Sequence, residues 1–303
     1  AAFLETLVPV DIVDLESGKQ RYAFFTNEEG GIMDDLMVAN LGDHLFVVVN
    51  AACKAQDIAH LQAHLPSGVE LEIIEDRALL AIQGPKAAAV LARFAPEVSE
   101  MLFMDIRKVD ILGAECIVSR SGYTGEDGYE ISVPADKAEE LARKLTAEDE
   151  VEWIGLGARD SLRLECGLCL YGHDLDTTTT PVEASLLWGI QKVRRIGGER
   201  EGGFPGADII LKQIETKDPQ YPLGLMFLGT QLHRHQLGEA VPCEKHQTDL
   251  PHHEYVSVPS LRLEDTEQAY RNPRTGPFWH QLQREVRVVV FSVVLESFSS
   301  PFR

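Results

Sequence analysis

TNEEGGIMDDLMVAN, residues 26–40, places two glycines before two adjacent aspartates and an apolar run. The glycine pair predicts a tight turn, because glycine adopts positive φ without steric cost. The residues from Ile32 to Val38 then predict a strand, in which Asp34 and Asp35 point to opposite faces. One carboxylate should therefore face inward, although both aspartates could instead lie near a solvated strand end.

The composition is that of a soluble globular protein. The 303 residues suggest about two domains, and 44% hydrophobic and 25% charged residues are ordinary proportions. A formal net charge of -20 repels nucleic acid and anionic membranes, so neither is an expected partner. No apolar run approaches the roughly 18–20 residues of a membrane span. An anionic substrate would need a local basic pocket.

The five cysteines are odd in number and irregularly spaced, which argues against a disulfide framework and favours a reducing compartment. Cys166 and Cys169 form a CxxC, for which redox chemistry is an alternative. Because the surrounding SLRLECGLCLYG is apolar with helical spacing, we interpret both as small core residues.

Periodicity predicts strands and helices in mixed order. Hairpin-like and crossover connections are both expected, which favours an α+β fold with mixed sheets over a regular βα repeat. The segments are a buried strand in 44–53, a helix in 54–65, two strands and a helix in 69–94, two strands around a Gly-rich loop in 115–134, and helices in 135–148 and 155–168.

The character of the chain changes beyond its middle. Residues 194–207 predict a linker or flexible loop, and one more strand is expected at 221–230. Six of the ten histidines lie beyond residue 230, among prolines and glutamines with weak periodicity, so this part should pack poorly except near Val286. Histidines and Cys243 there could in principle bind a metal, but their spacing fits no zinc template. We therefore predict three regions: residues 1–195, residues 196–229 as a linker and the start of a C-terminal domain, and an atypical tail 230–303.

Four polar features lie in apolar surroundings: Asp34 and Asp35, Asn50 after a valine run, the loop GYTGEDGYE ending in Glu130, and Arg159. Each has a purely structural alternative. Asn50 could cap the following helix, and the acids of the loop could form a solvated turn. Glu130 could face water, and Arg159 could pair with an acid of its own helix.

Six motifs occur in fixed order: TNEEGGIMDDLMV, HLFVVVNAACKAQDIAHL, LLAIQGPKAAAVL, SGYTGEDGYEISVP, GARDSLRLECGLCLYGHDLD and TTPVEASLLWGI. Over about residues 1–212 they resemble the T-protein family of the glycine cleavage system, the aminomethyltransferases. The resemblance implies a multi-domain cloverleaf with folate in a central cavity. It also implies further family residues before this start, and a C-terminal β-barrel domain that is degraded or absent here.

The resemblance implies the chemistry as well. An aminomethyl group on the dihydrolipoyl arm of lipoylated H-protein passes to tetrahydrofolate, releasing ammonia and giving 5,10-methylenetetrahydrofolate, with no metal involved. The expected location is the cytoplasm, in preference to a mitochondrial matrix.

Family residues carry over to matching positions. Glu130 matches a pterin-binding glutamate, and a carboxylate accepts both donors of a pterin edge. Arg159 matches a ligand-binding arginine, while Asn50 and Tyr123 match further cavity residues. Asp35 matches the catalytic aspartate, so we expect Asp35 to face the cavity of Glu130 and Arg159. Asp34 is then expected to face solvent or to cap a backbone amide.

Two other functions share this family. A non-catalytic folate-binding homologue, such as the iron–sulphur assembly relatives, has a cysteine-containing and glutamine-ended loop where this chain has GYTGEDG. The folate domain of a dimethylglycine or sarcosine oxidase is fused to a flavin domain, but no GxGxxG follows a strand here. The IMDD pair also favours the aminomethyltransferase.

Overall fold

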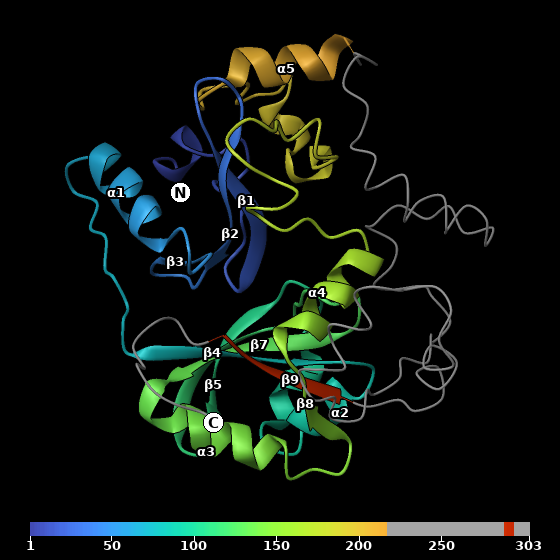
Figure 1. The fold of residues 1–303 in the computed structure, drawn as a ribbon. Coiled ribbons are helices and arrows are strands. Elements are labelled where there is room, and N and C mark those ends of the chain that lie inside the picture. The colour runs from blue at the N-terminus through green and yellow to red at the C-terminus, as the bar shows by residue number, and fades with distance from the viewer. Residues whose placement is uncertain (217–287, 294–303) are drawn as a thin grey trace, which may run out of the picture. The chain divides into compact units, whose positions relative to one another are not determined.

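The computed structural model describes residues 1–216 and 288–293, which form two compact units (Figure 1). Unit 1 comprises Ala1–Ile74 and the chain from Gly167 to residue 216. Unit 2 comprises Glu75–Cys166 and the strand at 288–293. Each unit is therefore made of two sequence segments that alternate along the chain, and the two segments of unit 1 must come together to complete its core.

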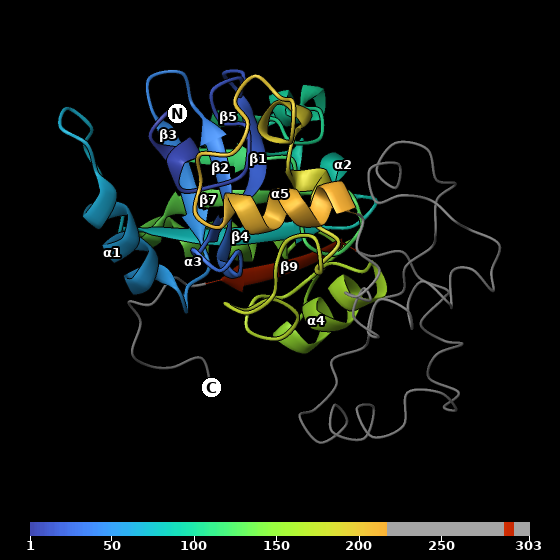
Figure 2. The same ribbon diagram turned by 90° about the horizontal axis from the view of Figure 1, so that it is seen from above.

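Unit 1 is built on a three-stranded antiparallel sheet in the order β1-β2-β3, with α1 beside it (Figure 1). The elements are the 3-10 turn Leu4–Thr6, β1 (Lys19–Thr26), β2 (Ile32–Asn40), β3 (Leu45–Val49), α1 (Lys54–His64), the 3-10 turns Leu187–Gly189 and Lys192–Arg194, and α5 (Ala207–Thr216). The long helix α5 is seen in Figure 2. Its Ile210 belongs to the same core cluster as Ile32 of β2.

The turn between β1 and β2 depends on its two glycines, as predicted. Gly30 has a φ of 80°, which favours glycine. A Cβ atom at Gly31 would lie 1.9 Å from the carbonyl oxygen of Thr177. The second segment of unit 1 therefore packs directly on this turn.

Unit 2 contains a six-stranded sheet in the order β5-β6-β7-β4-β9-β8, in which all pairs are antiparallel except β8 with β9. Alternate residues of β4 to β7, together with α2 and α3, form one buried core. The elements are β4 (Arg77–Gln83), α2 (Ala87–Leu91), the 3-10 turn Pro96–Glu100, β5 (Ile106–Ile111), β6 (Ala114–Ser119), β7 (Gly128–Pro134), α3 (Ala135–Leu145), β8 (Val151–Trp153), α4 (Leu156–Glu165) and β9 (Val288–Val293).

This architecture confirms the predicted α+β fold with mixed sheets. Two local predictions are wrong. Residues 69–75 form no strand: Val69, Leu71 and Ile73 alternate with acids, but the segment is largely exposed and pairs with no strand among the described residues. The strand predicted as buried after His44 is only half-buried along β3.

Other expectations lie partly outside the described residues. These are the strand at 221–230, the histidine-rich region with its metal alternative, and the fate of the C-terminal β-barrel domain. Of the tail, the structure describes β9, close to the strand-like segment near Val286. Among the described residues, none of the helices has the length and apolarity needed to cross a membrane.

Candidate functional site

The two adjacent aspartates do point to opposite faces of β2, but the inward one is Asp34. Burial alternates along the strand, and Asp34 is fully buried on the same side as Ile32, Leu36 and Val38. The prediction that Asp34 faces solvent is therefore wrong. Its alternative, that Asp34 caps a backbone amide, is confirmed, because Asp34 accepts a hydrogen bond of 3.2 Å from the amide of Asn50.

Asp35 is half-buried and is held by two neutral donors. The hydroxyl of Tyr22 donates to Asp35 Oδ2 at 2.8 Å, and Asn50 Nδ2 donates to Asp35 Oδ1 at 2.6 Å. The ring of Tyr22 stacks on Trp188, with centroids 5.3 Å apart. Burial raises the pKa of Asp35, the hydrogen bonds from Tyr22 and Asn50 oppose this, and the charge of Asp34 adds to it. The result is a fixed carboxylate with an affinity for protons above the ordinary one.

Asn50 connects the two aspartates. Its Nδ2 donates to Asp34 Oδ1 at 2.8 Å as well as to Asp35, so one amide bridges both faces of the strand. The helix-capping alternative is therefore wrong, since the N-cap position of α1 is occupied by Cys53. A third acid, Asp57 in the first turn of α1, is 1% exposed. We call Asp34, Asp35 and Asp57 the carboxylate cluster.

In unit 2, Glu130 lies on the face of β7 opposite the core. Its neighbours Tyr129 and Ile131 belong to the core cluster, and Glu130 itself is half-buried. Ser121 Oγ donates to Glu130 Oε2 at 3.1 Å and lies 2.9 Å from Ser119 Oγ. Glu130 is thus oriented by a short chain of serine hydroxyls.

The loop before Glu130 is held in one conformation by a buried glutamine. Gln83 Nε2 donates to the carbonyl oxygens of Ser121 (3.0 Å) and Tyr129 (3.3 Å), and its Oε1 accepts from Thr124 Oγ1 at 3.2 Å. A Cβ atom at Gly122 would lie 1.6 Å from Gln83 Oε1, so only glycine fits there.

The acids of this loop do not form a simple solvated turn. Asp127 receives two hydrogen bonds from Arg120, at 2.9 Å and 2.7 Å. This bidentate pair closes the loop on itself. The solvated-turn alternative is therefore wrong for Asp127.

Arg159 approaches the same loop from α4. Its guanidinium carbon lies 4.8 Å from the centroid of the Tyr123 ring, a cation–π contact. Asp160, an acid of the same helix, pairs with Arg163 at 2.8 Å. One loop therefore contacts both Glu130, through Ser121, and Arg159, through Tyr123.

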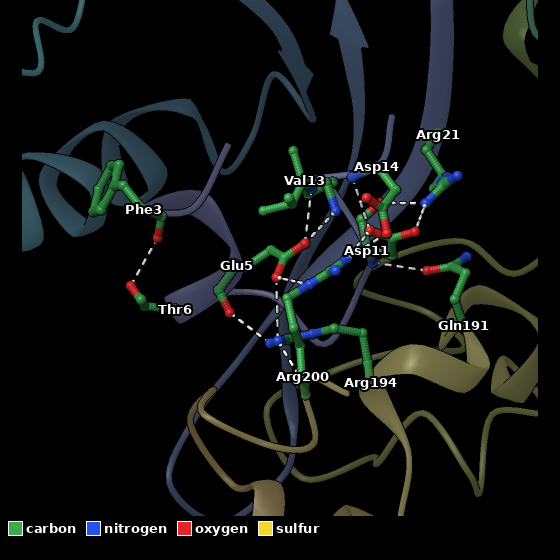
Figure 3. Close-up of polar contacts among 11 residues, drawn as sticks. Phe3, Glu5, Thr6, Asp11, Val13, Asp14, Arg21, Gln191, Arg194 and Arg200 are labelled. Carbon is green, nitrogen blue, oxygen red and sulfur yellow. Dashed lines mark hydrogen bonds and ion pairs between the residues drawn. The ribbon is translucent and has the colours of Figure 1, made fainter. Parts of the chain in front are cut away.

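Unit 1 also contains an ion-pair network near the N-terminus, which we call the N-terminal network. Figure 3 shows Glu5, Asp11 and Asp14 beside Arg21, Arg194 and Arg200. Glu5 Oε2 lies 3.2 Å from Arg194 Nη1 and 3.1 Å from Arg200 Nε. Its Oε1 accepts from the amides of Ile12 and Val13, each at 2.8 Å. The glycine-rich stretch after residue 194 is thus tied to the first residues of the chain.

The cysteines within the described part of the chain are free thiols: Cys53, Cys116, Cys166 and Cys169. Burial raises the pKa of Cys53 to about 12 and that of Cys116 to about 11, which makes both thiols unreactive. Cys169 is buried and Cys166 is half-buried, so the interpretation as core residues holds better for Cys169. In the part that the structure describes, no three histidine, cysteine, aspartate or glutamate side chains are arranged so that they could hold a metal ion.

Two residues of the site, Tyr22 and Asp57, are not predicted from the sequence. Tyr22, which donates to Asp35, lies in a strand where a tyrosine is unremarkable and gives no signal. The burial of Asp57 is indicated by a pattern in the sequence, because Cys53, Asp57 and Leu61 are each four residues apart and so lie on one side of α1. An acid between two core positions of a helix predicts a buried carboxyl.

The two-unit α+β fold and its buried carboxylates belong to a known protein family. The model described as the GCVT N-terminal domain matches residues 1–194, and the chain belongs to this family. It is 47% identical over 244 residues to "Aminomethyltransferase, mitochondrial" of Dictyostelium discoideum, covering 75% of this chain and 60% of that protein. It is 50% identical over 223 residues to the protein of the same name of Solanum tuberosum, covering 70% and 54%.

The fold is also similar to that of a solved structure from the same family. The crystal structure of glycine cleavage system aminomethyltransferase T from Bartonella henselae superposes with a TM-score of 0.63 at 41% identity. The match covers 71% of this chain and 58% of that one. The chain therefore spans a little over half the length of the relatives that it matches.

Proposed function

We propose that this chain acts as an aminomethyltransferase. It would transfer the aminomethyl group from lipoylated H-protein to tetrahydrofolate, releasing ammonia and giving 5,10-methylenetetrahydrofolate. The observation that carries the proposal is Asp35, a half-buried carboxylate fixed by Tyr22 and Asn50 in a chain of this family. Because its donors are neutral, the negative charge of this carboxylate is not already neutralised by a cation. It can therefore stabilise positive charge that develops on the substrate.

The reaction has a simple balance. Two carbon–nitrogen bonds form between the methylene and folate nitrogens, while one carbon–nitrogen and one carbon–sulfur bond break. The two folate N–H protons end on ammonia and on the dihydrolipoyl thiol. The methylene passes through an iminium-like, positively charged state, which the charge of Asp35 stabilises. Because burial raises its pKa, Asp35 is also suited to take up and return a proton.

The folate-binding role is assigned to Glu130, Arg159, Tyr123 and Asn50. The Glu130 carboxylate, oriented by Ser121, can accept hydrogen bonds from both donors of a pterin edge. The Arg159 guanidinium is a planar donor set suited to a pterin carbonyl or a folate carboxylate. Its contact with the Tyr123 ring restricts the directions in which it can donate.

The proposed partners are lipoylated H-protein and tetrahydrofolate. Neither nucleic acid nor a membrane is proposed, in view of the net charge of -20. No metal is assigned to the reaction. The proposed location is a reducing compartment, the cytoplasm or a mitochondrial matrix, and the names of the Dictyostelium and Solanum relatives support the latter. We further propose the three sequence regions 1–195, 196–229 and 230–303.

The test is a transfer assay on the full chain, with aminomethylated H-protein as donor and tetrahydrofolate as acceptor. Ammonia and methylenetetrahydrofolate should appear in equal amounts, and Asp35→Asn should abolish most of both. Folate binding without release of ammonia would instead identify a non-catalytic folate-binding homologue.

A further inference from the structure

Asp57 is a buried acid to which the proposed mechanism gives no role. Its carboxyl is enclosed between α1 and β2, on the same side of the helix as Leu61, and 1% of the residue is exposed. Neither of its oxygens has a hydrogen-bond donor among the described residues. Leaving an ionised carboxylate in this state would be very costly.

The polar group that faces the Asp57 carboxyl belongs to another acid. The Asp57 carboxyl lies within hydrogen-bonding reach of the Asp34 carboxyl, which is 0% exposed. Two ionised carboxylates only accept hydrogen bonds, so they cannot bond to each other. One shared proton removes the repulsion and supplies the missing donor. The pair therefore needs one proton in the folded protein.

The surroundings place this proton on Asp57. Asp34 already accepts from the amide and the Nδ2 of Asn50, and the Cys53 thiol lies in hydrogen-bonding contact with it. Asp34 therefore already accepts from other groups, while Asp57 has no donor among the described residues. Burial first, and then the neighbouring Asp34, raise the pKa of Asp57 from 3.8 to about 8.

The other titratable groups around Asp57 do not compete for the proton. Asp35 lies on the opposite face of β2 and acts only through its charge. Cys53 and Tyr171 also neighbour the pair, but burial raises the pKa of each to about 12, so both stay neutral while Asp57 titrates.

We infer that Asp57 is a positioning residue: as a neutral acid it donates to Asp34, which holds Asn50, which in turn holds Asp35. The protonation of Asp57 stands on its burial beside the buried Asp34 and on the lack of a donor to either of its oxygens among the described residues, while its relevance to turnover rests on the proposed function. Ionisation of Asp57 would add a second charge beside Asp34 and disturb the bridging amide of Asn50.

The first measurement is the infrared spectrum of the full chain near neutral pH. A band of a protonated carboxylic acid is expected, and Asp57→Asn should remove it. The matched control is Asp136→Asn, since Asp136 occupies the first turn of α3 as Asp57 occupies that of α1, but is exposed. The control should keep the band. Absence of the band in the wild type would overturn the inference.

The second measurement is the melting temperature as a function of pH. Between about 4 and about 8, folded wild type keeps a proton that the unfolded chain loses, so its stability falls as the pH rises. Asp57→Asn keeps a donor to Asp34 but cannot ionise, so it escapes this loss. Its melting temperature relative to wild type should rise across this range by at least about 5 °C. A constant difference, as expected for Asp136→Asn, would contradict the inference.

The third measurement separates positioning from protonation. The side-chain amide of Asn50 should exchange its hydrogens slowly in wild type and in Asp57→Asn. In Asp57→Ala, which has no donor, exchange should accelerate at least about tenfold, as for the loss of a hydrogen bond of about 1.4 kcal/mol. Equal exchange in all three would refute the positioning role. None of these measurements needs turnover, so failure of the proposed function would be seen separately in the transfer assay.

Discussion

Unit 1 contains two groups of buried acids that are stabilised in opposite ways. In the N-terminal network, Glu5 and Asp11 are matched by arginines (Figure 3). Within the described part of the chain, the carboxylate cluster forms no ion pair with arginine or lysine, and its donors are hydroxyl, amide and thiol groups.

The difference appears in proton affinity. Burial would raise the pKa of Asp11, but hydrogen bonding from Arg21 and the charges of Arg21 and Arg200 lower it overall. Burial raises the pKa of Asp35 and of Asp57, and no cation offsets it. The charge of a carboxylate that is paired with arginine stabilises the fold. Carboxylates held by neutral donors remain able to exchange a proton or to meet a ligand.

The largest effect is expected from removing the centre of the N-terminal network. Glu5→Ala leaves the buried Arg194 without its carboxylate and the amides of Ile12 and Val13 without their acceptor. The free energy of unfolding should fall by about 3–5 kcal/mol, measured by denaturant titration. Glu5→Gln, which keeps an acceptor for the amides, should lose less. A change below about 1 kcal/mol would show that the network does not hold unit 1 together.

At Asp35 of the carboxylate cluster, the same kind of change should affect the rate of turnover rather than stability. Asp35→Asn keeps size and hydrogen bonding but removes the charge, so turnover should fall by at least about a hundredfold, with little change in folate affinity. Asp34→Asn should cost much less in turnover. Because Asp34 is buried and accepts from Asn50, it should instead cost stability. Equal losses of turnover in both variants would mean that the wrong carboxylate has been chosen.

Glu130 extends the comparison to unit 2. It accepts from Ser121 and, among the described residues, it forms no ion pair, so its carboxylate resembles those of the carboxylate cluster. Glu130→Ala should weaken tetrahydrofolate binding by about 1.5–3 kcal/mol in calorimetry. Glu140→Ala, on the exposed side of α3, is the control and should bind normally. Unchanged affinity in the Glu130 variant would remove it from the site.

The smallest effect is confined to acid pH. The lowered pKa of Asp11 means that its contribution to stability is present above 3.8 and is lost as the pH falls through its folded value. The stability difference between wild type and Asp11→Asn should therefore shrink below this pH. Thermal melts across the acid range would show it. A difference that grows on acidification would contradict the assignment of Asp11 to the cation-matched group.

The sequence predicted the strand alternation at Asp34 and Asp35 but not its direction. Ile32, Leu36 and Val38 occupy one face, while the other face carries two methionines, and this contrast was too weak to decide. The direction is decided by α1, which covers the Ile32 face and adds Asp57 there. Likewise, residues 69–75 carried strand-forming residues, but a strand needs a neighbour, which local pattern does not reveal.

The split of unit 1 into two sequence segments has a consequence for biogenesis. Glu5 leaves the ribosome early, whereas Arg194 and Arg200 follow 189 and 195 residues later. Until then the Glu5 carboxylate lacks its arginine partners, so the first segment of unit 1 cannot complete its fold while residues 75–166 are being synthesised. Ribosome-bound chains arrested before residue 194 should expose the β1–β2–β3 segment to protease. Chains extended past residue 216 should protect it, which makes the completion of unit 1 a timed, late event.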